Sequence, residues 1–391
     1  MQSPQLRAGD QADGPRSATW LELFFDLVFV VAVAELAHNL SENVSVLEFL
    51  AFAGLFVPVW WAWIGSTFYA TRFDTDDLVH RLFTAIEIFL VVVLAVNIHD
   101  GFGATSGGFA LAYAAIRGLL VFKYYMAGRN VPKAKPLTTR YARGFGLAAV
   151  VWLVSVFVPT PYRFGLWAIG LSISFATPIT AGDLHGEIPP HALHLPERFG
   201  LFTIIVLGEA IVAVVTGVAD QTWSAWSVAA AVGSVMIAVS LWWVYFDNLD
   251  GSAIRAAQQE GETVLYQEWL YLHLPLVVGL TATGVGVEHV LTSELRAPLP
   301  AGERWLLCGA LALCLFTLSA LHHTTDTYTD RGTRIQSLYR SGAGAVVMLV
   351  AIVGTGLTSI TIVGLLAVIC VTQIVLDLRE REPRAEVVPR D

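Results

Sequence analysis

The chain has 391 residues, of which 55 % are hydrophobic and 14 % are charged, and its mean hydropathy is +0.62. This composition excludes an ordinary water-soluble globular protein. The net charge of −9 excludes little, because in a membrane protein the placement of charge matters more than its sum. Apolar runs of about 20 residues recur along the chain, and each is long enough to cross roughly 30 Å of hydrocarbon. The composition therefore predicts an all-α, polytopic transmembrane helical bundle.

The hydropathy pattern predicts about twelve membrane spans. In chain order they are 18–40, 46–70, 79–99, 108–128, 140–158, 163–182, 198–218, 223–247, 269–291, 303–323, 337–356 and 358–378. Residues 1–17 contain no apolar stretch ahead of a cleavage site, so we expect the first span to serve as its own insertion signal.

The basic residues predict the orientation of these spans. With the N-terminus inside, nearly all of the 23 Lys and Arg residues lie toward the cytoplasm. The exceptions are Arg117, which falls inside a span, and Arg163, Arg296 and Arg304 on the outer side. Such an imbalance predicts that both termini are cytoplasmic.

Short motifs recur in the same order in both halves of the chain. Glu22-Leu23-Phe24 followed by Glu35 parallels Glu197-Arg198-Phe199 followed by Glu209, and Trp60-Trp61-Ala62-Trp63 parallels Trp242-Trp243-Val244-Tyr245. We predict two parallel six-span repeats, because six is an even number and the halves then share one orientation. The predicted domains are a cytoplasmic tail at 1–17, a first repeat at 18–183, a linker at 184–196, a second repeat at 197–378 and a cytoplasmic tail at 379–391.

Four motifs resemble the bacterial low temperature requirement A family. They are Trp20-Leu21-Glu22-Leu23-Phe24-Phe25-Asp26-Leu27-Val28-Phe29-Val30, Thr71-Arg72-Phe73-Asp74-Thr75-Asp76-Asp77, Gly182-Asp183-Leu184-His185-Gly186-Glu187, and Leu195-Pro196-Glu197-Arg198-Phe199-Gly200-Leu201 leading to Leu207-Gly208-Glu209. The resemblance implies a bacterial inner-membrane protein with many spans and carries no settled biochemical activity. More loosely, the segment around Asp26 resembles the opening helix of the lysosomal potassium-channel family, from which the chain departs in having Phe24-Phe25-Asp26 and Leu201.

Ionisable residues inside spans are the candidate functional groups, because each costs several kcal/mol in hydrocarbon. Glu22 and Asp26 are four residues apart, so they lie on one helix face, with Asp26 about 12 Å deep. Two acids so placed share a proton or a cation, which describes an ion or proton site. The alternative for Glu22 is a structural brace that accepts hydrogen bonds from the backbone or from Arg72.

Glu87 is expected at the depth of Asp26, and Arg117 lies near the middle of the fourth span. Because a buried guanidinium needs a carboxylate, we predict that Arg117 pairs with Glu87 or Asp26, either as a structural lock or as a gate. Glu209 is the deepest acid of the second half and follows Gly208, which lets a neighbouring helix come close. Secondary candidates for ion or proton binding are Glu35, His38, Glu197, Asp247 and His273.

The linker contains His185, His191 and His194, which suggest zinc. Pro189-Pro190 make this segment a turn before a new helix, so we predict a plain connector and no metal site, with metal binding as the alternative.

The sequence as a whole favours a transporter that moves protons, or a solute coupled to protons or cations, through an acid-lined bundle interior. Alternatives are a passive cation channel and a non-transporting membrane scaffold or lipid- or stress-related protein. We expect no enzyme activity and no cofactor, because no phosphate loop, nucleophile elbow or His-Glu-x-x-His motif is found. Expected partners are membrane lipids and a small ion or solute but no nucleic acid, and a homo-oligomer is possible.

Overall fold

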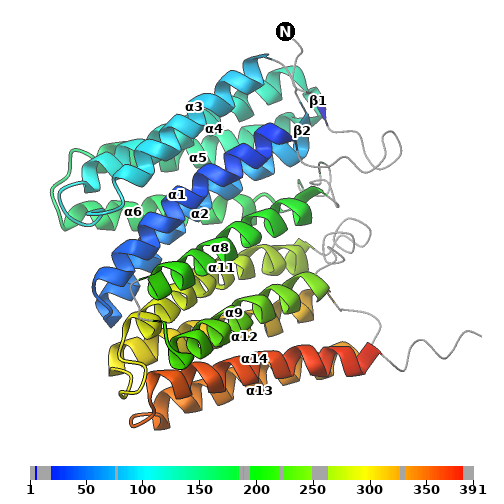
Figure 1. Ribbon diagram of the computed structural model, residues 1–391. Helices are drawn as coiled ribbons and strands as arrows, with labels where there is room; N and C mark the ends of the chain where they lie inside the picture. The colour runs from blue at the N-terminus through cyan, green and yellow to red at the C-terminus, as the bar shows by residue number, and fades with distance from the viewer. Residues whose placement is uncertain are drawn as a thin grey trace, which may run out of the picture. The chain divides into compact units, whose positions relative to one another are not determined.

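The computed structural model describes residues 5–6, 19–74, 78–182, 184, 188, 194–219, 223–248, 263–325 and 331–381. Within these ranges the chain forms twelve α-helices, one short 3-10 helix and one pair of two-residue strands (Figure 1). The helices are α1 (Trp20–Glu42), α2 (Val46–Arg72), α3 (Leu78–Val96), α4 (Ser106–Asn130), α5 (Lys135–Ser155), α6 (Tyr162–Ile179), α8 (His194–Ala219), α9 (Ala225–Asn248), α11 (Thr263–Thr292), α12 (Ala301–Thr325), α13 (Arg331–Val353) and α14 (Ser359–Arg381). The remaining elements are η1 (Pro132–Ala134), β1 (Gln5–Leu6) and β2 (Phe73–Asp74).

The fold class predicted from the sequence is confirmed, since each helix overlaps one predicted span. Among the described residues, nine helices are long and apolar enough to cross a membrane, namely α2, α3, α4, α8, α9, α11, α12, α13 and α14. The starts of α11 and α13 lie at Thr263 and Arg331, ahead of the predicted 269 and 337. Hydropathy detects only the part of a helix that is apolar enough for hydrocarbon, whereas backbone hydrogen bonding continues through its polar ends.

The start of α1 is determined by local side chains. The Thr19 backbone N–H donates to Glu22 Oε2 at 2.8 Å, and the Glu22 N–H donates to Thr19 Oγ1 at 3.3 Å. This reciprocal pair is a capping box, which satisfies backbone donors that the first turn of a helix leaves without partners. Glu22 therefore accepts a backbone hydrogen bond at the start of its own helix.

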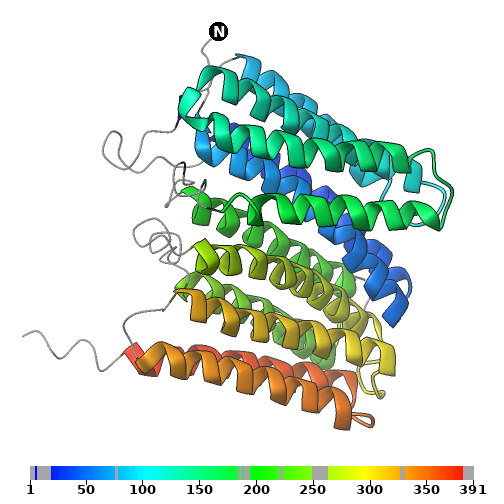
Figure 2. The ribbon, with the colours of Figure 1, turned by 180° about the vertical axis from the view of Figure 1, so that it is seen from behind.

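The helices group into two compact units. The first unit comprises residues 1–39, 50–202 and 254–267. In it, α4 packs against α3 and α5, and α5 packs against α6 (Figure 1; Figure 2 shows the same helices from behind). An aromatic cluster joins α2, α4 and α5 through Tyr69, Tyr124 and Tyr141, whose rings lie 5.1 to 5.3 Å apart. The strands β1 and β2 pair antiparallel.

The second unit comprises residues 40–49, 203–253 and 268–391. Its α12 packs against α13, and α14 packs against both α9 and α13. Small residues allow close approach: a Cβ on Gly279 of α11 would lie 2.8 Å from Cys314 Sγ of α12, and one on Gly233 of α9 would lie 2.7 Å from Val363 Cγ1 of α14. Small residues at helix contacts are typical of membrane bundles. The predicted duplication and its domain boundaries stay predictions.

Candidate functional site

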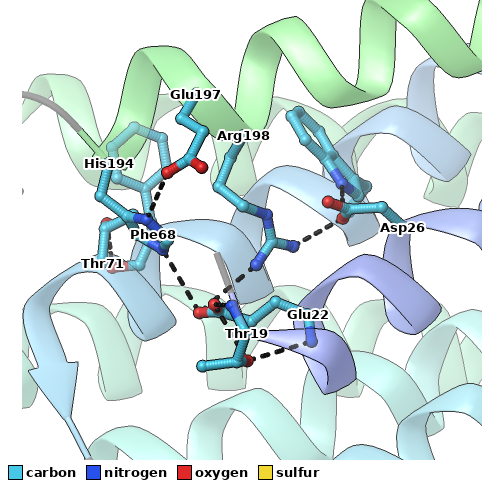
Figure 3. Close-up of polar contacts among 9 residues, drawn as sticks. Thr19, Glu22, Asp26, Phe68, Thr71, His194, Glu197 and Arg198 are labelled. Atoms are coloured by element: carbon cyan, nitrogen blue, oxygen red, sulfur yellow. Dashed lines mark hydrogen bonds and ion pairs between the residues drawn. The ribbon is translucent and has the colours of Figure 1, made fainter. Parts of the chain in front are cut away.

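Asp26 is the most deeply buried acid among the described residues of the first unit. It lies in α1 with none of its surface exposed. Its Oδ1 atom accepts hydrogen bonds from Trp63 Nε1 of α2 at 2.8 Å and from Arg198 Nη2 of α8 at 2.5 Å (Figure 3). The other oxygen, Oδ2, is buried and has no hydrogen-bond partner among the described residues. The carboxylate thus connects three helices, and its Oδ2 atom can still accept hydrogen bonds.

Arg198, the fifth residue of α8, lies between two carboxylates. Its Nη2 contacts Asp26, and its Nη1 lies 3.5 Å from Glu22 Oε1. The sequence analysis named Glu197 as a secondary candidate and did not name Arg198, but the structure buries Arg198 at 1 % exposure. Arg198 was therefore missed as a site residue. A signal existed, since it lies three residues after buried Leu195 and four before buried Phe202, the spacing of one helix face.

His194 extends this network toward the surface of the first unit. It is the first residue of α8, not part of a connecting loop as predicted. Its Nδ1 lies 3.2 Å from Glu197 Oε2, and its Nε2 lies 3.4 Å from Glu22 Oε1 (Figure 3). The other two linker histidines, His185 and His191, lie outside the described residues, which contain no group of three or more side chains placed to hold a metal.

A second buried charge cluster joins α2, α3 and α4. Glu87 of α3 forms an ion pair with Lys123 of α4 and accepts a hydrogen bond from Ser66 of α2. All three side chains are buried. The sequence placed Lys123 with the cytoplasmic basic residues, because counting Lys and Arg around a loop does not reveal a side chain that points back into the bundle.

The predicted pairing of Arg117 with Glu87 or Asp26 is wrong, because Lys123 and Arg198 occupy those carboxylates. Arg117 instead donates from Nη1 to the Trp61 carbonyl oxygen at 3.3 Å. Its guanidinium carbon lies 4.9 Å from the centre of the Phe145 ring and 5.5 Å from that of Tyr113. Aromatic faces attract cations but do not neutralise them.

Glu209, the candidate of the second unit, is only partly buried in α8. A charged group that acts on it is another acid, Glu288 of α11. Among the described residues of this unit, Arg340 Nη2 forms a buried ion pair with Asp377 Oδ2 at 3.0 Å, which the sequence did not identify. Arg340 and Asp377 both lie toward the helix ends that the sequence predicts to be cytoplasmic.

Of the secondary candidates, Glu197 contacts His194, and the other four are distributed over both units. Glu35 is partly buried and His38 is exposed on α1, and Asp247 is partly buried in α9 near Arg340. His273 of α11 is buried, with Nδ1 2.7 Å from the Trp269 carbonyl oxygen and Nε2 3.1 Å from the Tyr245 hydroxyl. The carbonyl can only accept, so Nδ1 is a donor, and both ring nitrogens of His273 have hydrogen-bond partners within the core.

Comparison with known proteins confirms the resemblance found in the sequence. The family model of the bacterial low temperature requirement A protein matches residues 17–377. An uncharacterized protein of Rhizobium meliloti (strain 1021), RA0937, is 30 % identical over 285 residues, which is 70 % of this chain and 69 % of that protein. No solved structure matches the chain.

Proposed function

The chain belongs to the bacterial low temperature requirement A family of membrane proteins, and from its buried charge network we propose that it moves protons, or a solute coupled to protons. We place this transport in the bacterial cytoplasmic membrane, with both termini in the cytoplasm. Nine apolar helices within the described part of the chain make it a multi-pass membrane protein. We also propose that the protein contacts membrane lipids and uses no cofactor.

One observation carries the proposal: ionisable groups form a continuous series from a half-exposed carboxylate to a fully buried one. The Glu197 side chain is 36 % exposed, and Asp26 is 0 % exposed. The groups between them are His194, Glu22 and Arg198, in that order. Successive polar atoms are 3.2, 3.4, 3.5 and 2.5 Å apart. An imidazole can take a proton on one nitrogen and release one from the other, which suits His194 to its position between two acids.

Arg198 supplies a way to couple protonation to movement. When Asp26 takes up a proton, its attraction for the guanidinium falls, whereas Glu22 still attracts it from 3.5 Å. The guanidinium then shifts toward Glu22 along α1. Because Arg198 is on α8, this shift changes the contact between two helices, which is the two-state element that a coupled transporter needs.

The same geometry favours protons over metal cations as the transported species. Both carboxylates at Arg198 and the carboxylate at Lys123 already contact a tethered cation. A free cation would have to displace an arginine or lysine that cannot leave, whereas a proton needs only to change the charge of the acid. The passive cation channel is for this reason the less favoured form of transport.

A membrane scaffold is the second candidate, and the bracing of the acids favours it. Asp26 holds α1, α2 and α8 together, and Glu87 holds α2, α3 and α4 together. Buried ion pairs commonly determine geometry without any transport. In this case the acids would matter for folding but not for the movement of any ion.

Flux measurements separate the two candidates. The purified protein is reconstituted into liposomes containing a pH-sensitive dye, and a pH gradient is imposed. We expect proton flux for the parent protein and for Glu35→Gln, a matched control that changes a partly buried acid on the same helix outside the network. Asp26→Asn, which keeps the shape and the Trp63 contact, should reduce flux to that of protein-free liposomes. A parent protein without flux, or an active Asp26→Asn variant, would leave the scaffold as the better account.

A further inference from the structure

A long stretch of the first unit contains basic residues but no acidic ones. No Asp or Glu occurs between Asp100 and Asp183, a stretch that includes α4, η1, α5 and α6. Arg117 and Lys123 of this stretch are buried inside the unit. The charges of the other Lys and Arg residues are therefore not balanced by any acid close to them in the sequence.

Five basic side chains are exposed around the connection between α4 and α5. They come from the last turn of α4, from η1 and from the first three turns of α5, and they are Arg129, Lys133, Lys135, Arg140 and Arg143. None of the five forms an ion pair with a described residue. Like charges that are this close repel one another, so an anionic partner that neutralises them is bound favourably.

The exposed face of α5 changes from basic to apolar along the helix. Leu147, Val150 and Val154 follow Arg143 at intervals of four, three and four residues, which is the spacing of one helix face. Leu147 and Val150 are each 56 % exposed, and Val154 is 48 % exposed. In a membrane protein, exposed apolar side chains on a helix face contact acyl chains. The cations of α5 therefore lie at one end of a surface that contacts lipid.

The exposed face of α4 shows the same change in the opposite chain direction. Phe122 and Tyr125 are both exposed, and Arg129 follows them on the same helix face. The guanidinium carbon of Arg129 lies 5.9 Å from the centre of the Tyr125 ring. An exposed tyrosine beside a cation is typical of the level of the lipid headgroups, where one end of the ring is apolar and the other is wet. The cations of α4 and α5 thus meet at one headgroup level, next to two apolar helix faces.

We propose that the exposed basic residues at the α4–η1–α5 connection bind the headgroup of an anionic phospholipid, whose acyl chains lie along the exposed faces of α4 and α5. The charge selects an anionic headgroup over a zwitterionic one, because a zwitterionic headgroup carries a cation of its own. The adjoining apolar faces select a lipid over a soluble phosphate, which has no apolar part to bury.

This inference rests on the proposed contact with lipids and names the headgroup. It does not rest on proton movement, because none of these basic residues belongs to the series of groups that ends at Asp26. A flux measurement and a lipid-binding measurement therefore fail independently of each other.

Thermal unfolding of the full chain in a nonionic detergent tests the proposal, with phosphatidylglycerol or phosphatidylcholine of the same acyl chains added in steps. A lipid that binds only the folded protein raises the unfolding temperature with its concentration. We expect phosphatidylglycerol to act at lower concentrations than phosphatidylcholine. The difference should shrink as salt is added, because salt screens exposed charges. Inorganic phosphate at the same concentrations should leave the unfolding temperature unchanged.

Arg140→Gln and Arg143→Gln each remove one exposed charge, and neither side chain forms an ion pair with a described residue, so both variants should fold as the parent does. Each should raise the phosphatidylglycerol concentration that gives half of the stabilisation by about fivefold. The matched control is Arg379→Gln, at an exposed arginine of α14 that precedes Glu380, and it should change that concentration little.

Three results would overturn the proposal. The first is equal stabilisation of the parent protein by the two lipids. The second is stabilisation by inorganic phosphate as strong as that by phosphatidylglycerol. The third is a response of Arg140→Gln and Arg143→Gln that matches the response of Arg379→Gln.

Discussion

Arg198 Nη2 lies 2.5 Å from Asp26 Oδ1, although the two residues are 172 positions apart in the chain. Both are buried, so neither charge can turn to water when the other is removed. We expect Arg198→Ala to lower the free energy of unfolding by about 3 to 5 kcal/mol, because it leaves a buried carboxylate without its cation. The measurement is thermal unfolding in detergent. Adding Asp26→Asn should restore much of the loss, and an additive double variant would contradict the pairing.

The Glu87–Lys123 pair gives a second prediction. Lys123→Met keeps the length of the side chain and removes its charge, which leaves Glu87 buried with only the Ser66 hydroxyl as a donor. We expect a marked loss of folded protein, measured by size-exclusion chromatography after membrane extraction, and recovery when Glu87→Gln is added. Lys133→Met, at an exposed lysine of η1, is the control and should behave as the parent. Equal behaviour of the two lysine variants would contradict the burial of Lys123.

The hydrogen bond from Trp63 to Asp26 can be isolated with a matched pair of substitutions. Trp63→Phe and Trp60→Phe remove the same atoms from two buried tryptophans of α2, but Trp60 Nε1 has no partner among the described residues. A hydrogen bond to a charged group contributes about 1.5 to 3 kcal/mol. We expect Trp63→Phe to lower the free energy of unfolding by about that much more than Trp60→Phe. Equal losses would show that the Trp63 bond contributes nothing.

The orientation inferred from the basic residues predicts which helix connections face the periplasm. Single cysteines are introduced at two exposed positions. These are Asn43, between α1 and α2, and Lys133, in η1. The native Cys308, Cys314 and Cys370 are buried and should react little. A membrane-impermeant thiol reagent added to intact cells should label Cys at 43 and not at 133. The reverse pattern would invert the topology.

The sequence by itself predicted twelve helices and nearly all of their bounds, because membrane insertion depends on the local density of apolar side chains. It also identified Glu22, Asp26 and Glu87 as unusual, since an acid inside a span is recognisable from its neighbours alone. The sequence placed the starts of α11 and α13 too late, because Thr263 and Arg331 lie in polar turns that hydropathy does not detect.

Only the tertiary structure decided which cation each acid contacts. Arg198 was not named as a candidate, and Lys123 was counted with the cytoplasmic basic residues. Both side chains are buried in the first unit and pair with the carboxylates that had been expected for Arg117. Pairing depends on which helices are neighbours and on the rotation of each helix about its own axis. Residues such as Asp26 and Arg198 are brought together by packing that no local pattern encodes.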